Sequence, residues 1–372
     1  MTSPYAIALS HFAPFGSRTY VKLFGFYHNE EAIWNATSDE LTALGLQPKT
    51  IDSFLAFRQR TDIPQLVASL DKLNIATVDR NDSRFPAALK TIHDPPIILY
   101  VRGTLPSTDQ LIGIVGSREA TEYGTKTARR FSQELSQAGL LVVSGLARGI
   151  DTEAHEGALS VGKKTVAVLA HGLEQLHGEK RSFAQRIIDQ GGAIISEQPP
   201  YFKAEKFHFP IRNRIIAGMS RGVVIVEAAI ASGTLRTAQC AIDAHREVFA
   251  IPGPIDSITS EGANKLLQDG AHVTMSPNDV LLALGLPARP PLEPIIVPTA
   301  LPTVGAVARV ETVAVTLSPE QATVLAQLSA EPKHTNDIAR EAGLSTGVVL
   351  GALTILEIHG KVRSLGNQHY CL

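Results

Sequence analysis

The sequence has few of the residues and patterns that mark secreted or membrane proteins. It holds two cysteines in 372 residues, Cys240 and Cys371, so we expect no disulfide framework and a reducing, cytoplasmic location. No apolar run approaches the roughly 18 residues of a membrane-spanning helix. The amino-terminal MTSPYAIALSHF lacks a charged leader followed by an apolar core, so no signal peptide is expected. The sequence therefore predicts no membrane partner.

Metal-ligand groupings and an excess of positive charge are also missing. The 12 histidines form no H-x-H or H-E-x-x-H group, so His155, His171 and His208 are interpreted as packing or capping residues. We expect neither a metal nor a cofactor. The 34 Lys+Arg against 36 Asp+Glu give a formal net charge of −2. Any nucleic-acid site must therefore come from local clustering of cations.

The length and a hydrophobic content of 44% indicate two or three globular domains. Helical periodicity predicts an all-helical amino-terminal domain, and six prolines mark a linker in the carboxyl-terminal third. The predicted segments are a helical domain (1–80), an extended connector (81–109), an α/β domain (110–286), the Pro-rich linker (287–316) and a winged-helix domain (317–372).

Residues 110–286 alternate short apolar strands with amphipathic helices, which predicts a doubly wound, mainly parallel sheet. The central stretch, residues 209–253, is predicted to form a helix, a strand, a helix and a strand joined by very short connections. Its second helix is predicted to open with a cap formed by Ser232, Gly233 and Thr234, where free N–H groups and the helix dipole favour an anion.

The tail from 317 to 372 gives three helices and a small hairpin bracketed by Gly360 and Gly366, the pattern of a winged helix-turn-helix. It carries four Lys+Arg and five Asp+Glu. This balance favours a protein-docking module over a DNA-binding one.

Four polar segments follow strands of the predicted sheet, and ligands of such sheets bind beyond the carboxyl ends of the strands. We therefore expect these segments to converge at one edge: VGSR (115–118), SGLARGID (144–151), SEQPP (196–200) and EAAIASGT (227–234).

Individual side chains in these segments suit phosphate. Gly116, Ser117 and Arg118 supply open N–H groups, a hydroxyl and a planar guanidinium. A plain turn with Arg118 in a structural ion pair is an equal alternative. Arg148 is a candidate phosphate ligand, and Asp151 is predicted to cap the following helix.

The segment KAEKFHFPIRNRI (203–215) adds further candidates. Of Arg212 and Arg214, one is expected to pair with Glu227 or Glu197 as framework, while the other faces the ligand. Lys206 beside two phenylalanines suits a single strand with stacked bases. The alternative is that both phenylalanines belong to the core.

Taken in order, VGSR, SGLARGID, FPIRNRIIAGMS and EAAIASGTLRTA, followed by VFAIPGPI and GANKLLQDGA, closely resemble the DNA-processing protein A (DprA, or Smf) family. The resemblance implies a Rossmann-like domain with a sterile-alpha-motif-like, helix-hairpin-helix-related module before it and a winged helix after it. It implies a cytoplasmic homodimer that binds and protects incoming single-stranded DNA, loads RecA during natural transformation and has no catalytic residue.

Matching positions carry over a DNA- and phosphate-binding set: Gly116, Ser117, Arg118, Arg148, Lys206, Phe209, Arg212, Ser232, Gly233 and Thr234. One segment departs from the family pattern. Where the family has a glycine-rich turn and a Tyr-Pro…Asn segment, this chain has AHGLEQLHGEKRSF (170–183). Contacts from this loop are in doubt, although Lys180 and Arg181 could substitute electrostatically.

Two other functions compete with this interpretation. The same Rossmann variant resembles the lysine-decarboxylase-like nucleotide phosphoribohydrolases, which carry a catalytic glutamate shortly after a Gly-Gly-x-Gly-Thr segment. Here Arg236 or Thr237 stands in that place, so no base is evident. The third possibility is a nucleotide sensor that signals through the tail.

Overall fold

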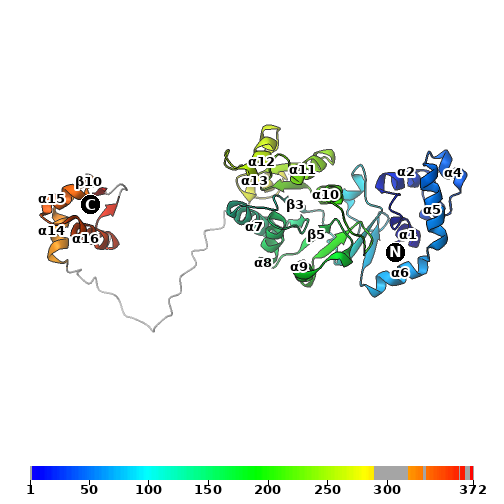
Figure 1. The fold of residues 1–372 in the computed structure, drawn as a ribbon, viewed down its shortest axis with the longest axis horizontal. Coiled ribbons are helices and arrows are strands. Elements are labelled where there is room, and N and C mark those ends of the chain that lie inside the picture. Colours follow the sequence, from blue (N-terminus) through cyan, green and yellow to red (C-terminus); the bar gives the residue numbers. More distant parts are fainter. Residues whose placement is uncertain (1, 289–316, 330–331, 360, 365–368, 372) are drawn as a thin grey trace. The chain divides into compact units, whose positions relative to one another are not determined.

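The computed structural model describes residues 2–288, 317–329, 332–359, 361–364 and 369–371. It divides into two units, Met1–Pro291 and Leu292–Leu372, which are treated separately (Figure 1). Residues 289–316 of the predicted linker lie outside the described residues. The finer boundaries predicted at 80, 109 and 286 stay predictions.

The first unit begins with a helical region, as predicted. Side chains cap the amino ends of several of its helices. Asn29 accepts hydrogen bonds from two backbone amides of α3, and Thr37 and Glu40 form a capping box at α4. The first and last helices are ones that the periodicity did not reveal. The helices are α1 (Pro4–Ser10), α2 (Ser17–Tyr27), α3 (Glu30–Asn35), α4 (Ser38–Ala43), α5 (Pro48–Arg60) and α6 (Ile63–Lys72).

A nine-stranded sheet forms the centre of this unit, in the order β1-β2-β6-β5-β4-β3-β7-β8-β9. The strands from β3 to β9 pair in parallel, while β2 pairs antiparallel with β1 and β6. The doubly wound fold is thus confirmed. The strands are β1 (Ala76–Asp79), β2 (Ile98–Gly103), β3 (Leu111–Val115), β4 (Leu141–Ser144), β5 (Thr165–Leu169), β6 (Ala193–Ser196), β7 (Gly222–Ile225), β8 (Glu247–Ala250) and β9 (His272–Val273).

Strand β2 lies in the segment predicted to be an extended connector. It is buried and hydrogen-bonded on both sides, so residues 98–103 extend the sheet instead of only linking two domains. Between β1 and β2 the chain forms the short 3-10 helix η1 (Ala87–Thr91), which packs against α10 (His208–Met219) on one face of the sheet.

Successive side chains of the strands point to opposite faces, so each strand contributes to two cores. Ile112 and Ile114 of β3 pack with α7, α8 and α13, whereas Leu111 and Val115 pack with η1, α10 and α11. The covering helices besides α10 are α7 (Glu122–Gln137), α8 (Ile150–Ser160), α9 (Gly178–Asp189), α11 (Gly233–Asp243), α12 (Ile258–Gln268) and α13 (Pro277–Ala283), with the 3-10 helix η2 (Leu173–Gln175) between β5 and α9.

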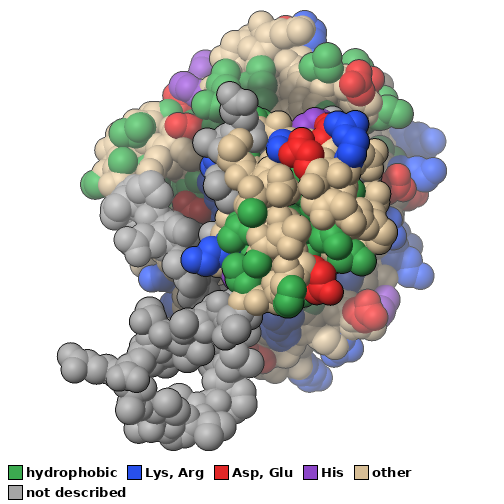
Figure 2. Space-filling model, turned by 90° about the vertical axis from the view of Figure 1, so that its left-hand side faces the viewer, with side chains coloured by type: hydrophobic (Ala, Val, Ile, Leu, Met, Phe, Trp, Pro, Cys, Tyr) green, Lys and Arg blue, Asp and Glu red, His purple; other side chains and the backbone are tan. Residues whose placement is uncertain are grey.

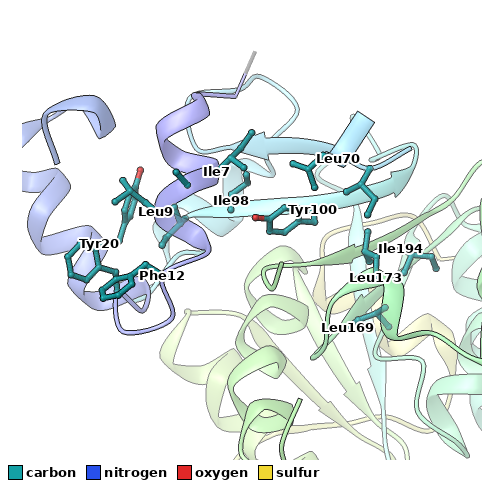
Figure 3. Packing of buried hydrophobic residues seen from close by; sticks show 14 of the residues in the cluster. Ile7, Leu9, Phe12, Tyr20, Leu70, Ile98, Tyr100, Leu169, Leu173 and Ile194 are labelled. Carbon is teal, nitrogen blue, oxygen red and sulfur yellow. The ribbon is translucent and has the colours of Figure 1, made fainter. Parts of the chain in front are cut away.

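The amino-terminal helices and the sheet share one continuous core. Phe12 of the turn after α1 lies in the same buried cluster as Ile98 and Tyr100 of β2 and Ile194 of β6 (Figure 3). Tyr100 also hydrogen-bonds Ser10 at 2.6 Å. The helical region is therefore built onto one face of the sheet.

The described residues of the second unit form three helices and a small sheet of order β10-β12-β11, which matches the predicted winged helix. Its hairpin is formed by β11 and β12, while Gly360 and Gly366 lie outside the described residues. The elements are α14 (Pro319–Ala326), β10 (Lys333–His334), α15 (Thr335–Ala342), α16 (Thr346–Ile358), β11 (Arg363–Ser364) and β12 (His369–Cys371).

The exposed face of α16 carries apolar side chains in place of cations. Val348, Leu350 and Ile355 are each more than a third exposed, and the helix contains neither Lys nor Arg. In Figure 2 the side of this unit turned to the viewer carries several green hydrophobic side chains and few blue ones.

Candidate nucleic-acid interface

The sheet has a topological switch point at β3. From β3 the chain adds β4, β5 and β6 on one side, and then returns to place β7 on the other side. The loops after β3 and β7 therefore diverge, which opens a crevice at the carboxyl ends of these strands. A cavity of about 390 Å³ lies there, and all predicted positions except Arg148 line it: Gly116, Ser117, Arg118, Lys206, Phe209, Arg212, Ser232, Gly233 and Thr234.

One wall of this cavity is the amino end of α11. Ser232 caps the helix by accepting a hydrogen bond from the Thr234 amide at 3.1 Å, as the sequence predicts. Gly233 is exposed, and apart from its chain neighbours and the backbone of its own helix no described atom lies within 4 Å of where its Cβ would be. The first-turn N–H groups and the positive end of the helix dipole thus border open space, an arrangement that favours an anion.

Arg118 and Phe209 form a second wall. The Arg118 Cζ lies 5.2 Å from the centre of the Phe209 ring, a cation–π contact. Arg118 is exposed and forms no ion pair with the described residues, so the structural ion-pair alternative does not apply. The core alternative for the phenylalanines is wrong as well, because Phe207 is 57% exposed and Phe209 is only half-buried.

Glycines allow the loops after β3 and β4 to approach each other closely. A Cβ on Gly116 would lie 2.6 Å from a carbon of Ile150, so any other residue would push α8 away. Gly149 has a φ of +84°, and its Cβ would lie 2.4 Å from the Ser117 carbonyl oxygen. These contacts hold the Ser117–Arg118 turn in place.

Glutamates anchor the framework around the cavity. Glu197 pairs with Arg214, which confirms one of the predicted pairings. Glu227 does not pair with an arginine. It is 2% exposed and accepts bonds from the amide and hydroxyl of Thr121, so it fixes the start of α7.

The guanidinium of Arg212 is not free to bind a ligand, because it is buried and already hydrogen-bonded. Arg212 is 5% exposed, and its Nη1 donates to the carbonyl oxygens of Gly145, at 2.9 Å, and Val168. Burial lowers the pKa of Arg212 to about 10, and the neighbouring Asp151 carboxylate partly offsets this shift. Arg212 therefore ties the loop after β4 to strand β5, and it also lines the cavity.

The predicted cap by Asp151 is wrong. Helix α8 is preceded by Gly149 without a side-chain cap, and Asp151 lies inside its first turn. Its carboxylate instead accepts bonds from the amides of Gly145, at 3.2 Å, and Ala147, at 3.4 Å. Burial raises the pKa of Asp151 despite the nearby Arg212 guanidinium.

A second cavity of about 190 Å³ adjoins the first and shares four lining residues with it: Arg118, Ala147, Phe209 and Arg212. Arg148 lies here, and its Nε donates to the Arg118 carbonyl oxygen at 3.3 Å. Lys180, from the segment that departs from the family pattern, lines this cavity as well. Exposed cations thus continue from Arg118 past Arg148 to Lys180, while Arg181 faces a different cavity.

The SEQPP segment after β6 does not converge with the others, because β6 lies three strands from β3. Its place is taken by residues 206–216, which lead into and form α10. The predicted binding set also omits Glu119, an exposed carboxylate that lines the first cavity, and Asn213, whose Nδ2 donates to the Gly233 carbonyl oxygen at 3.4 Å. Each is next in sequence to a predicted residue, Arg118 or Arg212, and this adjacency is the signal that could have identified them.

Metal and membrane features are absent from the described part of the chain. Within these residues, no group of three or more His, Cys, Asp or Glu side chains is placed to hold a metal ion. No single described helix has the length and apolar composition to cross a membrane, and α15 and α16 reach that threshold only as a pair bent by 108°.

Comparison with known proteins gives matches over both units. Residues 76–285 match the family model for DNA recombination-mediator protein A, and residues 311–368 match the DprA winged helix domain. Protein Smf of Escherichia coli K12 is 38% identical over 257 residues, covering 67% of this chain and 68% of that protein. Protein Smf of Synechocystis is 33% identical over 390 residues, covering 98% of each.

Solved structures agree with these matches. DNA processing protein A of Streptococcus pneumoniae superposes with a TM-score of 0.65 at 33% identity, covering 76% of this chain and 98% of that one. For DNA processing protein A of Helicobacter pylori, described for its single-stranded DNA binding mode, the TM-score is 0.51 at 28% identity, covering 56% and 95%. The chain therefore belongs to the DNA recombination-mediator protein A family.

Proposed function

We propose that this chain binds single-stranded DNA at the carboxyl edge of the sheet. The observation that carries the proposal is the meeting of a helix amino end with the Arg118–Phe209 cation–π pair in one cavity of about 390 Å³. A backbone phosphate would bind between Gly233 and Arg118. The adjoining base would stack on Phe209, and the next phosphates would follow Arg148 and Lys180.

The proposed selectivity for single strands rests on the stacking surface. Phe209 can stack on a base only if that base is not already stacked and paired in a duplex. The described binding mode of the Helicobacter pylori relative supports this choice of ligand. Since the whole chain has a net charge of −2, the local row of cations is what attracts the strand.

The test is a titration of one labelled single strand and its duplex at several salt concentrations. We expect tighter binding of the single strand and a logarithmic affinity that falls linearly with the logarithm of salt. A Phe209→Leu variant should lose about 1–3 kcal/mol of single-strand affinity with an unchanged salt slope, because stacking and not charge is removed. Equal affinity for the duplex would contradict the proposal.

We further propose that the protein acts as a homodimer that protects incoming DNA and loads RecA during natural transformation. Strand β9 lies at the sheet edge, and Val273, Met275 and Leu282 near it are each more than half exposed. A two-fold contact there would place two strand sites on one particle and give avidity on longer DNA.

Two measurements separate these claims. Light scattering at micromolar concentration, with a DNA-length series, tests the dimer: a monomer with length-independent affinity would refute it. The rate of RecA filament nucleation on protein-coated single strands tests the partner: an unchanged rate would refute the loading role alone.

We propose no catalytic turnover. Arg236 and Thr237 occupy the positions after the Ser-Gly-Thr turn where the phosphoribohydrolases have their acid, and Asp151 is buried and held by backbone amides. The exposed Glu119 is the carboxylate to test. Incubation with nucleoside monophosphates should release no free base, and release that Glu119→Gln abolishes would favour the hydrolase alternative.

A further inference from the structure

A separate cavity of about 450 Å³ lies where the amino-terminal helices meet the sheet. Its walls come from the carboxyl end of α6, from β2 and β6, from η2 and from α9. The volume falls in the range of about 300–1,000 Å³ that holds small-molecule ligands. The cavity shares Leu176 with the second DNA cavity and contains none of the ten residues of the predicted DNA- and phosphate-binding set; Arg181, considered as a substitute contact, lines this cavity instead of the DNA cavities.

The floor of this cavity is apolar. Leu173, Leu176, Ala184 and Ile194 line it, and each is less than 9% exposed to solvent. Half-buried Ile188 of α9 adds to the same surface. An apolar body of a ligand would therefore be removed from water here, which favours its binding.

The rim of the cavity carries uncompensated positive charge. Arg102 pairs with Glu174 and also donates to the Leu73 carbonyl oxygen at 2.9 Å, so these two charges are matched. The side chains of Lys72 and Arg181 are exposed and form no ion pair or hydrogen bond with the described residues. Two free cations thus stand above an apolar floor.

We propose that this cavity is a binding site for a small amphipathic anion. The apolar body of the anion would lie on the apolar floor, and its carboxylate or phosphate group would contact Lys72 and Arg181. Arg181 would bind such a group with its planar fork of donors and Lys72 as a point charge. The site is distinct from the proposed DNA site and does not depend on it.

The experiment uses the full chain and the fluorescent probe 1-anilinonaphthalene-8-sulfonate, an aromatic body with one sulfonate. We expect saturable binding that the double variant Lys72→Ala/Arg181→Ala weakens about tenfold or more, because two charge-assisted contacts are lost. Binding of the neutral analogue N-phenyl-1-naphthylamine should hardly change. The matched control Lys163→Ala/Lys164→Ala removes two exposed cations outside the cavity and should change neither.

A second variant distinguishes this cavity from other apolar surfaces. Gln185 is exposed at the rim, so Gln185→Trp can cover the opening without disturbing the core, and it should abolish binding of both probes. Displacement of the sulfonate by octanoate or by AMP tells a carboxylate ligand from a phosphate ligand. Unchanged sulfonate binding in either variant, or displacement by neither anion, would overturn the proposal. Single-strand binding, measured in parallel, reports separately on the DNA site.

Discussion

Replacing Arg118 by alanine is the sharpest perturbation of the proposed DNA site. The side chain is exposed and has no ion pair among the described residues, so no other charge is left buried and unmatched when it is removed. The loss then reflects the phosphate contacts themselves. One charge-assisted contact, or a bidentate pair, contributes about 1.5–3 kcal/mol, which corresponds to roughly 13- to 160-fold weaker binding.

The salt dependence gives a second, independent magnitude. Removing one cation from a single-strand contact should reduce the slope of log K against log salt by about 0.7. Arg118→Lys keeps the charge but loses the planar fork, so we expect an intermediate affinity with the wild-type slope. Fluorescence anisotropy with a short labelled oligodeoxythymidine, over a series of salt concentrations, measures both quantities.

A matched control comes from α7. Arg130 is also exposed and lies 6.0 Å from an aromatic ring, that of Phe131, but it pairs with Glu134 on the same helix and lines neither DNA cavity. Arg130→Ala should therefore leave affinity and slope unchanged. If Arg118→Ala unfolds at the wild-type temperature and binds within about twofold of wild type with the same slope, Arg118 does not contact phosphate.

Three further predictions concern stability, assembly and the tail. Burial lowers the pKa of His155 to about 3, so below about pH 6.5 this histidine is protonated in the unfolded chain but stays neutral in the folded chain. Lowering the pH from 7 to 5 should therefore decrease the free energy of unfolding by about 2 kcal/mol more in wild type than in His155→Gln, as measured by urea denaturation. Val273→Asp should place a charge in the proposed edge contact, giving a monomer by light scattering and removing the steep dependence of affinity on DNA length; a stable dimer would move the interface elsewhere. Residues 1–286 alone should retain single-strand affinity within about threefold, because the tail has four Lys+Arg against five Asp+Glu and α16 exposes apolar side chains; a large loss in a folded, dimeric fragment would show that the tail binds DNA.

The strand–helix alternation of the sheet was predictable from sequence because it is local. Each apolar strand and each cap, such as Ser232 on α11, depends on neighbouring residues. Strand order is set by pairings between residues far apart in the chain, and no local pattern reports them. For that reason the position of the SEQPP segment, and the pairing of β2 with β6, were not foreseen.

The residues that line the cavity were largely predictable from the sequence. The exposure and the hydrogen-bond partners of each side chain were not. Arg118 and Arg212 look equivalent in sequence, yet one is exposed and the other is 5% exposed and bound to backbone carbonyls. The difference comes from Gly145, where a Cβ would lie 2.5 Å from the Arg212 guanidinium. Such close approaches depend on the packing of three segments, which a single sequence does not encode locally.

The core shared by the amino-terminal helices and the sheet affects how the chain is synthesised. Roughly 120 residues separate the end of α6 at Lys72 from Ile194 of β6, against which the helical cluster packs. At about 5–20 residues per second, the ribosome needs roughly 6–24 s to complete that stretch. Until then the part of this cluster that α9 and β6 contribute, including Ile187 and Ile194, has not been made, so the emerging helices and β2 present an incompletely covered apolar surface to the cell. We therefore expect the nascent chain to bind ribosome-associated chaperones, and we expect slow translation before β6 to increase its aggregation.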